Sequence, residues 1–157
     1  MELLRTQRLL LRHWEESDLP ASTTSTRGTT SCAGWDRTRA VPWRPWTRRA
    51  SGTVPLLPLS DADGPTGLIE VGWHLHPQHQ GQGCATEAAG ALLAAAATAG
   101  IGEVLALTDL DNVRSQAVAA RLGMSDEGTT DRWFGLTARQ FRKILTADGQ
   151  RALWSGL

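Results

Sequence analysis

Two glycines separated by one residue, Gly81 and Gly83, stand between an apolar segment and an alanine-rich segment. Glycines let a backbone approach a ligand without side-chain obstruction. The first amides of a helix lack intrahelical partners and carry partial positive charge, so a helix that starts here offers a phosphate site. No acidic residue occurs between Gly72 and Thr86, which leaves that helix end open to an anion. We therefore predict that residues 79–85 bind a pyrophosphate.

The glycine pair is also compatible with simpler interpretations. An ordinary strand-to-helix turn often contains such a pair, and the pair alone does not exclude it. A Walker loop is excluded because no Gly-Lys-Ser/Thr sequence follows. A complete dinucleotide fingerprint is excluded because the third glycine is missing.

Two titratable side chains, Glu70 and His74, lie on the apolar segment just before the turn. Its alternation predicts a strand over residues 67–75 with two distinct faces. One face carries Ile69, Val71, Trp73 and Leu75, and the other carries Glu70, Gly72 and His74. The histidines at positions 74, 76 and 79 straddle a strand end and a proline, so we predict no metal site.

The elements that position these residues follow from hydrophobic spacing and capping residues. Asn112 is a good N-cap for the second helix. The sequence predicts strands over residues 8–14, 54–59, 67–75, 103–108 and 124–133, and the strand at 54–59 should be an edge strand because prolines interrupt it. It predicts helices over residues 85–99 and 113–122 and the start of a helix at 15–20. It also predicts a turn at 61–65 and either a helix or a strand over 137–145. This order is typical of a mixed α/β layer structure, and the length of 157 residues fits a single domain over residues 1–157.

Residues 21–52 lack any apolar period and contain six arginines against one acidic residue, Asp36. Taken alone, such a segment predicts a loop or disorder. Its Arg, Thr, Ser, Trp and Pro bias resembles a reading frame translated out of register, so our hypothesis is a frame-disrupted segment. The competing interpretation is polyanion or RNA binding through Arg44, Arg48 and Arg49 among tryptophans. We favour the solvated loop over nucleic-acid binding.

The composition is that of an ordinary globular protein, with 41% apolar and 20% charged residues and zero net charge. Nothing global indicates nucleic acid or a membrane surface. No apolar run reaches the length of about 18 residues that a membrane helix needs. Cys32 and Cys84 form no disulfide framework or zinc-ligand spacing, so we expect a reduced, cytoplasmic protein.

The wider context of the glycine pair narrows these interpretations. Gln78 precedes Gly81 and Gly83 in the pattern Gln/Arg-x-x-Gly-x-Gly/Ala, and residues 67–93 as a whole resemble the acetyl-coenzyme A motif of the GNAT N-acetyltransferases. Ala85-Thr86-Glu87-Ala88, the later stretch TDLDNVRSQAVAARLGM and the opening RTQRLLLRHW resemble the ribosomal-protein N-terminal acetyltransferase subgroup. The resemblance covers residues 5–19 and 54–141.

The resemblance implies a GNAT-like fold, in which a central, mostly antiparallel sheet is flanked by helices and splayed next to the strand at 67–75. It implies acetyl-coenzyme A as cosubstrate and no metal. Strand amides hold the pantetheine arm, the turn holds the pyrophosphate, and Asn112 hydrogen-bonds the pantetheine. The residues that the resemblance assigns to the cofactor are Val71, Trp73, Leu75, Gln78, His79, Gln80, Gly81, Gln82, Gly83, Cys84, Ala85 and Asn112.

The implied reaction is direct attack of a primary amine on the thioester. Glu70 is the first candidate for the base, with His74 as the alternate, although Glu70 also suits a salt bridge. Many GNAT enzymes protonate the thiolate with a tyrosine, and this chain has none. Ser115, which the resemblance places near the sulfur, is the motif-supported substitute, although it also suits an ordinary N3 position. Backbone amides beside residues 72–74 are the candidates for stabilising the oxyanion.

The acceptor is either a protein N-terminus, as in the subgroup, or a small-molecule amine. Trp133 and Phe134 are candidates for the acceptor pocket, although aromatic residues at a strand end are more often core. The family often forms dimers, so a homodimer is one expectation. The alternative function is a catalytically impaired acyl-coenzyme A-binding protein whose acceptor side is defective.

Overall fold

The computed structural model describes residues 2–13, 40–45 and 52–145. The helix start expected at residues 15–20 lies outside these ranges. So does most of the segment 21–52, together with the frame-disruption hypothesis and with Arg48 and Arg49 of the alternative polyanion site.

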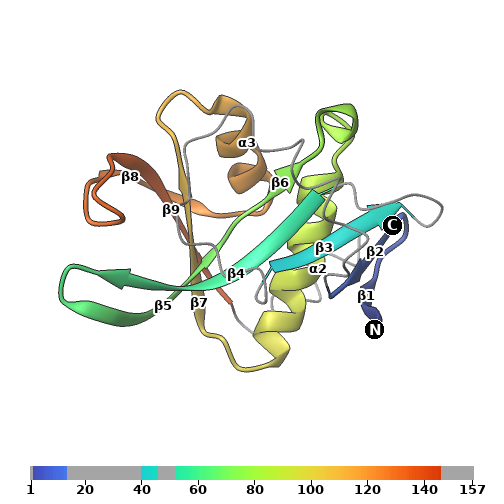
Figure 1. Ribbon diagram of the computed structural model, residues 1–157, viewed down its shortest axis with the longest axis horizontal. Coiled ribbons are helices and arrows are strands. Elements are labelled where there is room, and N and C mark those ends of the chain that lie inside the picture. The colour runs from blue at the N-terminus through green and yellow to red at the C-terminus, as the bar shows by residue number, and fades with distance from the viewer. Residues whose placement is uncertain (1, 14–39, 46–51, 146–157) are drawn as a thin grey trace.

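A nine-stranded sheet forms the frame of the described chain (Figure 1). Its strands are β1 (Glu2–Arg5), β2 (Leu9–Arg12), β3 (Ala40–Pro45), β4 (Gly52–Asp61), β5 (Gly64–Val71), β6 (His74–Leu75), β7 (Glu103–Thr108), β8 (Ser125–Thr130) and β9 (Ala138–Ile144). The strand order is β1-β2-β3-β4-β5-β7-β9-β8, and β6 pairs with β4. Every pairing is antiparallel except that of β5 with β7. The prediction of a mostly antiparallel α/β sheet is confirmed.

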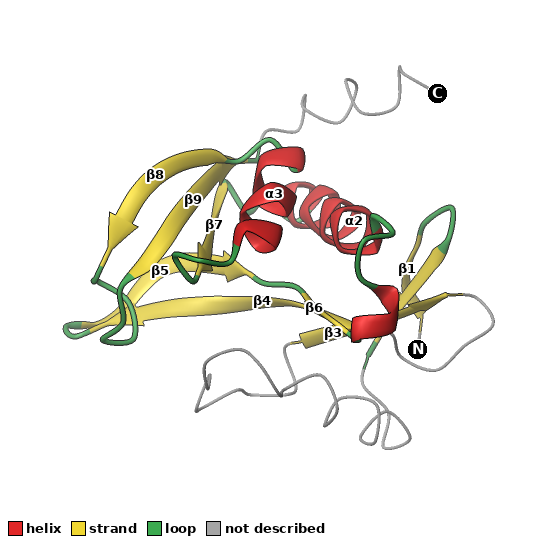
Figure 2. Cartoon of the chain, turned by 90° about the horizontal axis from the view of Figure 1, so that it is seen from above, coloured by secondary structure: helices red, strands yellow, loops and turns green. Residues whose placement is uncertain are grey.

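Two α-helices of the described chain, α2 (Cys84–Thr98) and α3 (Val113–Arg121), lie on the same side of the sheet (Figure 2). A short 3-10 helix, η3 (Pro77–His79), precedes the glycine turn. The side of α2 that faces the sheet carries small and branched apolar residues at helical spacing, as predicted. Its buried members are Cys84, Ala85, Ala88, Ala89, Leu92, Leu93 and Ala96.

Two apolar clusters show which face of the sheet each residue occupies. The main core cluster contains the buried side of α2 together with Val71, Val104 and Ala106. The second cluster contains Leu105 and Trp133. Because successive strand residues point to opposite faces, the second cluster lies on the face away from the helices.

The sheet splays between β5 and β7. These strands pair in parallel at a single register position, Glu70 opposite Leu105. Beyond it the chain of β5 turns to β4, where His74 of β6 pairs with Thr53, whereas β7 stays with β9 as far as Thr108. A gap between strands therefore opens just after Glu70.

The predicted continuous strand over residues 67–75 is wrong at Gly72 and Trp73, where β5 has ended and β6 has not begun. The Gly72 amide donates to the Pro55 carbonyl at 3.0 Å, and a Cβ at position 72 would lie 3.0 Å from the Pro55 ring. Glycine therefore permits this close approach. The predicted faces are nevertheless confirmed, because Ile69, Trp73 and Leu75 pack on the main core cluster.

Two other predictions need revision, and one alternative that the sequence left open is decided. The segment at 54–59 is not an edge strand throughout, because β3 covers β4 as far as Pro55. Beyond that point, within the described residues, β4 pairs only with β5, so Pro58 lies where its missing N–H costs no ladder bond with β3. The unpatterned segment contributes β3, which is held by pairing on both sides. The ambiguous segment at 137–145 is a strand, β9.

Candidate active site

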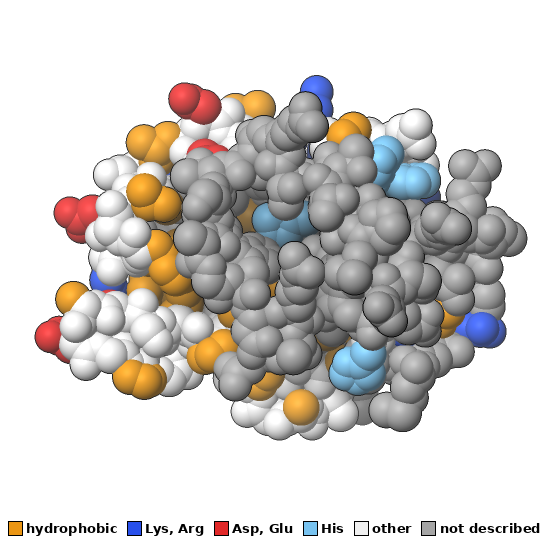
Figure 3. Space-filling model, in the orientation of Figure 1, with side chains coloured by type: hydrophobic (Ala, Val, Ile, Leu, Met, Phe, Trp, Pro, Cys, Tyr) orange, Lys and Arg blue, Asp and Glu red, His pale blue; other side chains and the backbone are white. Residues whose placement is uncertain are grey.

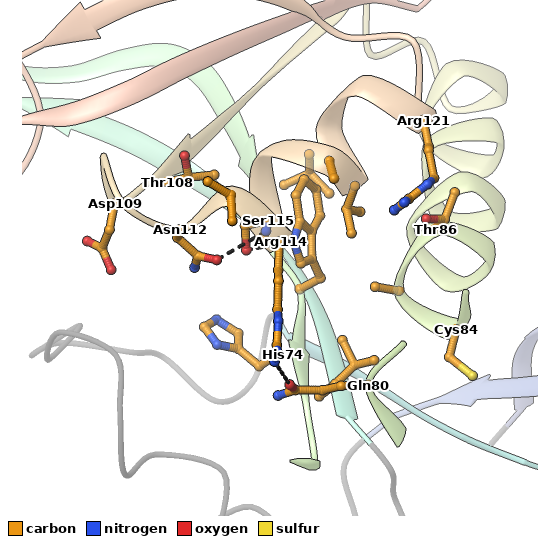
Figure 4. A pocket seen from close by; sticks show the side chains of 18 of the residues that line it. His74, Gln80, Cys84, Thr86, Thr108, Asp109, Asn112, Arg114, Ser115 and Arg121 are labelled. Atoms are coloured by element: carbon orange, nitrogen blue, oxygen red, sulfur yellow. Dashed lines mark hydrogen bonds between the residues drawn. The ribbon is translucent and has the colours of Figure 1, made fainter. Parts of the chain in front are cut away.

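A cleft of about 1380 Å³ opens where the sheet splays, between β5 and β6, the glycine turn, and the starts of α2 and α3 (Figure 4). Of the residues assigned from the sequence, those that line the cleft are Glu70, Val71, Trp73, Leu75, Gln80, Gly81, Gly83, Cys84, Ala85, Asn112 and Ser115. Gln78, His79 and Gln82 do not line it. The Gln82 side chain instead donates to the Gln78 carbonyl at 3.0 Å, so these two residues brace the turn from outside.

The backbone of the turn requires its two glycines. Gly81 and Gly83 have φ angles of +74° and +75°, in the left-handed region that other residues adopt only with strain. Gly83 is also the N-cap of α2 and accepts the first helical hydrogen bond, from the Glu87 amide at 3.0 Å. The glycine spacing therefore sets the shape of the turn and the point at which the helix begins.

Six consecutive backbone amides at this turn have no hydrogen-bond partner anywhere in the described chain. They belong to residues 81–86, of which the last three form the first turn of α2. We call these six amides the anion cradle. Free amides at the positive end of a 15-residue helix form an environment suited to a phosphate group.

The cleft is also lined by two arginines, Arg114 and Arg121, which the sequence analysis did not single out. They lie seven residues apart on α3, a spacing that places both on one side of a helix and that the sequence already contained. Arg114 donates from Nη1 to Oε1 of Gln80 at 3.1 Å, a contact drawn in Figure 4. Both guanidinium groups add positive charge to the wall that faces the cradle.

The start of α3 brings Asn112, Ser115 and Trp73 together. Asn112 is the N-cap, as predicted, and its Oδ1 accepts from the Ser115 amide at 3.1 Å. The Trp73 indole Nε1 donates to the Ser115 Oγ at 3.2 Å. Because that bond occupies the oxygen as an acceptor, the Ser115 hydroxyl proton is left to donate elsewhere.

Glu70 lies on the opposite face of the sheet from Trp73, at the single register pair where β5 and β7 separate. It is partly buried, and its carboxyl group makes no hydrogen bond or ion pair within the described chain. Burial raises the pKa of Glu70 to about 7. The salt bridge considered from the sequence is therefore not formed with any described residue, and the carboxylate is poised to exchange a proton near neutral pH.

His74 lines the same cleft, and burial lowers its pKa. Its imidazole is therefore neutral at physiological pH.

Of the amides expected to stabilise an oxyanion, that of Gly72 is already bonded to Pro55. The neighbouring Trp73 amide makes no hydrogen bond in the described chain and remains the better candidate.

A comparison with protein-family models adds to the evidence from the free amides, the Asn112 cap and the splayed sheet. A model described as an acetyltransferase (GNAT) domain matches residues 8–125. The chain belongs to the GNAT acetyltransferase family. It is accordingly an acyltransferase, of a family that uses acetyl-coenzyme A.

Solved structures share the fold of this GNAT acetyltransferase. An acetyltransferase from Agrobacterium tumefaciens is 25% identical, with a TM-score of 0.72 over 89% of this chain and 92% of that chain. The ribosomal-protein alpha-N-acetyltransferase RimL in complex with coenzyme A is 19% identical, with a TM-score of 0.69 over 94% and 100%. A variant of the spermidine N-acetyltransferase SpeG from Vibrio cholerae is 14% identical, with a TM-score of 0.72 over 94% and 99%. A search among curated protein sequences found no match.

Neither aromatic residue proposed for the acceptor pocket lines the cleft of this GNAT acetyltransferase. Trp133 is 1% exposed, and its indole donates to Gln140 Oε1 at 2.6 Å, so it belongs to the core. Phe134 is exposed, with a φ of +57°. The alternative that these aromatic residues belong to the core therefore holds for Trp133 only.

Acidic side chains lie both at the edge of the sheet and in the cleft. On the face shown in Figure 3, acidic side chains lie along the edge that carries the hairpins β4–β5 and β8–β9. Asp109 and Asp111, on the loop before α3, line the cleft. Among the described residues no group of three His, Cys, Asp or Glu side chains converges as metal ligands. No helix in those residues has the length and apolar character to span a membrane.

Proposed function

We propose that this GNAT acetyltransferase moves the acetyl group of acetyl-coenzyme A to a primary amine by direct attack on the thioester. The observation that carries the proposal is a single cleft with the anion cradle at one end and Glu70 at the other. An enzyme that transfers an acetyl group from a polyanionic cofactor to an amine needs this combination, namely free donors for phosphate and a base for the ammonium.

The residues present suit the cofactor. The anion cradle supplies six donors for the pyrophosphate, and Arg114 and Arg121 supply positive charge beside it. Asn112 uses its amide oxygen as the α3 cap, which leaves its amide nitrogen to donate to the pantetheine arm. Acetyl-coenzyme A supplies the acetyl group as a thioester, whose carbonyl carbon is open to attack by an amine.

The two faces of the sheet divide the chemistry. Glu70, on the face away from the helices, takes the proton of the acceptor ammonium so that the neutral amine can attack. As the N–C bond forms, the Trp73 amide stabilises the carbonyl oxygen. When the C–S bond breaks, the nitrogen gives up its second proton to solvent and the thiolate leaves. On the helix face, the Ser115 hydroxyl donates a hydrogen bond to the departing thiolate, which needs no protein acid because a thiol is a good leaving group near neutral pH.

The charge of two residues that line the cleft supports a cationic acceptor. Asp109 and Asp111 favour a cationic group in the part of the cleft that they line. RimL is a ribosomal-protein alpha-N-acetyltransferase and SpeG a spermidine N-acetyltransferase, so both acceptor classes occur on this fold. We include protein N-termini and small polyamines among the candidates.

The test measures thiol release from acetyl-coenzyme A across a panel of peptide N-termini, polyamines and other small amines. Acetylation of at least one amine, with a mass increase of one acetyl group, supports the proposal. Release at the rate of hydrolysis alone across the whole panel, with no acetylated product, contradicts it.

A second candidate is an acyl-coenzyme A-binding protein with impaired catalysis. The observation that favours it is the absence of tyrosine from the whole chain, which removes the usual acid of the family. This candidate predicts tight coenzyme A binding in calorimetry without turnover on any amine, so the same panel decides between the two.

A further inference from the structure

Glu87 poses an electrostatic problem for the anion cradle. It lies in the first turn of α2, one residue after the last amide of the cradle. A carboxylate at this position stabilises the helix through its dipole but repels a phosphate bound at the same end. Phosphate binding at this end therefore requires that the negative charge of Glu87 be neutralised by a neighbouring group.

The turn between β1 and β2 provides hydrogen-bond donors to the Glu87 carboxylate, although it lies 79 to 81 residues away in sequence. Glu87 Oε1 accepts from the Thr6 hydroxyl at 2.5 Å and from the Arg8 amide at 3.0 Å. Glu87 Oε2 accepts from Arg8 Nε at 2.7 Å, and Arg8 Nη2 lies 2.6 Å from the same oxygen. Four donor contacts therefore engage both oxygens of one carboxylate.

Arg8 also contacts the turn itself. Its Nη1 donates to the Gln82 carbonyl at 3.1 Å, and its Nη2 lies 3.5 Å from where a Cβ on Gly83 would be. A carbonyl held by the guanidinium cannot rotate into the cradle. The same arginine thus fixes a peptide of the turn and neutralises Glu87.

The ionisation of Glu87 is consistent with this geometry. Partial burial raises the pKa of Glu87, but the hydrogen bonds from Thr6 and Arg8 outweigh it, and the pKa lies below its ordinary value. The carboxylate stays charged, so its compensation depends on Arg8.

We propose that Thr6, Arg8 and Glu87 form a clamp that sets the charge and geometry of the anion cradle, and that Arg8 is a positioning residue for the cofactor phosphates. The clamp rests on the proposed binding of coenzyme A. Arg8 acts through Glu87 and Gln82 and is not among the residues that line the cleft.

The test compares Arg8→Met, Glu87→Gln and the double variant by calorimetry with coenzyme A. Arg8→Met leaves the charge of Glu87 uncompensated, so we expect about tenfold weaker binding. The double variant removes both charges and should return to within about threefold of the wild type, the remaining loss being that of the Arg8 contact with Gln82. Glu87→Gln alone should bind coenzyme A at least as tightly as the wild type, because it leaves Arg8 unpaired.

Arg132→Met is the matched control. Arg132 pairs with Asp61 at 2.7 Å, and its side chain is 52% exposed, as is that of Arg8. The pair lies at the β4–β5 hairpin, away from the cradle, so coenzyme A affinity should not change.

A second readout separates the clamp from a general structural role. Turnover with S-acetyl-pantetheine, which lacks the pyrophosphate, should be the same in all variants, whereas kcat/KM with acetyl-coenzyme A should fall about tenfold in Arg8→Met. Equal losses with both thioesters, or a double variant as weak as Arg8→Met, would overturn the clamp.

Two further outcomes are decisive. If Arg8→Met does not fold, weaker binding by Glu87→Gln contradicts the clamp, because loss of the negative charge should not harm an anion site. Coenzyme A binding by the wild type with no change in any variant overturns the clamp alone. Absence of binding by the wild type itself overturns the proposed function and the clamp with it.

Discussion

The two ends of the cleft offer different parts of the protein to a ligand. At the cradle end the ligand-facing atoms are backbone amides of residues 81–86, and side chains such as Gln82 only brace them. At the other end the candidate base is one side chain, Glu70, whose proton affinity is set by burial. The first end depends on backbone conformation and the second on environment, so the two ends should fail in different ways when mutated.

Gly83→Val should show the largest effect. Valine is strained at a φ of +75°, so the turn would rearrange and the cradle would be lost. We expect coenzyme A binding to fall below detection in calorimetry while the thermal unfolding transition stays cooperative. Gly102→Ala is the matched control, because its φ is not positive and a Cβ there meets nothing within 4 Å. Unchanged affinity in Gly83→Val contradicts the assignment of the cradle.

Glu70→Gln tests the other end. The amide keeps the shape of the side chain but cannot take a proton, so kcat should fall on the order of a hundredfold. The affinity for coenzyme A should stay within about twofold, because Glu70 lies outside the cradle. Asp63→Asn, at the tip of the β4–β5 hairpin, is the control for loss of a carboxylate. Equal turnover in Glu70→Gln would remove it as the base and direct attention to His74.

The pH profile provides a smaller but more specific test. A base works only when deprotonated, and the pKa of Glu70 is raised to about 7. The wild-type kcat/KM should therefore rise as the pH increases through about 7 and level off above it. Glu70→Gln should lose this rise, whereas coenzyme A binding should show no step that depends on Glu70. A profile that is flat between pH 6 and 8 in the wild type argues against a base with this pKa.

Ser115→Ala and Trp73→Phe should have the smallest effects. Loss of one hydrogen bond to the thiolate should lower kcat about tenfold, and loss of the indole donor, which only orients the hydroxyl, about threefold. Ser125→Ala, on the exposed start of β8, is the control. Kinetics with saturating acetyl-coenzyme A provide the measurement. A larger loss in Trp73→Phe than in Ser115→Ala would show that Trp73 acts on something other than Ser115.

The sequence predicted the cradle end well, because its determinants are local. The glycine spacing, the apolar side of α2 and the Asn112 cap all lie within about one turn of the atoms that they position. The faces of residues 69–75 were also predictable, since they depend only on alternation. These features need no knowledge of what packs where.

The remainder depends on contacts between distant segments. No local pattern indicates that Arg8 meets Glu87, or that Pro55 approaches Gly72 and interrupts the strand. The strand β3 has no apolar period and is defined by its partners. The burial that shifts the pKa of Glu70 likewise exists only in the folded chain. Sequence reasoning could therefore name Glu70 as the candidate base but could not supply the reason that its pKa lies near neutral pH.

The splay of the sheet has a consequence for the stability of the protein. β5 and β7 share a single register pair, so a ligand seated in the gap adds contacts between two parts of the sheet that hold each other weakly there. Ligand binding to the native state alone stabilises it by about 2.7 kcal/mol at a hundredfold excess over Kd. The lifetime of this enzyme in a cell should then follow the supply of its own cofactor, with starved cells clearing it faster than well-fed ones.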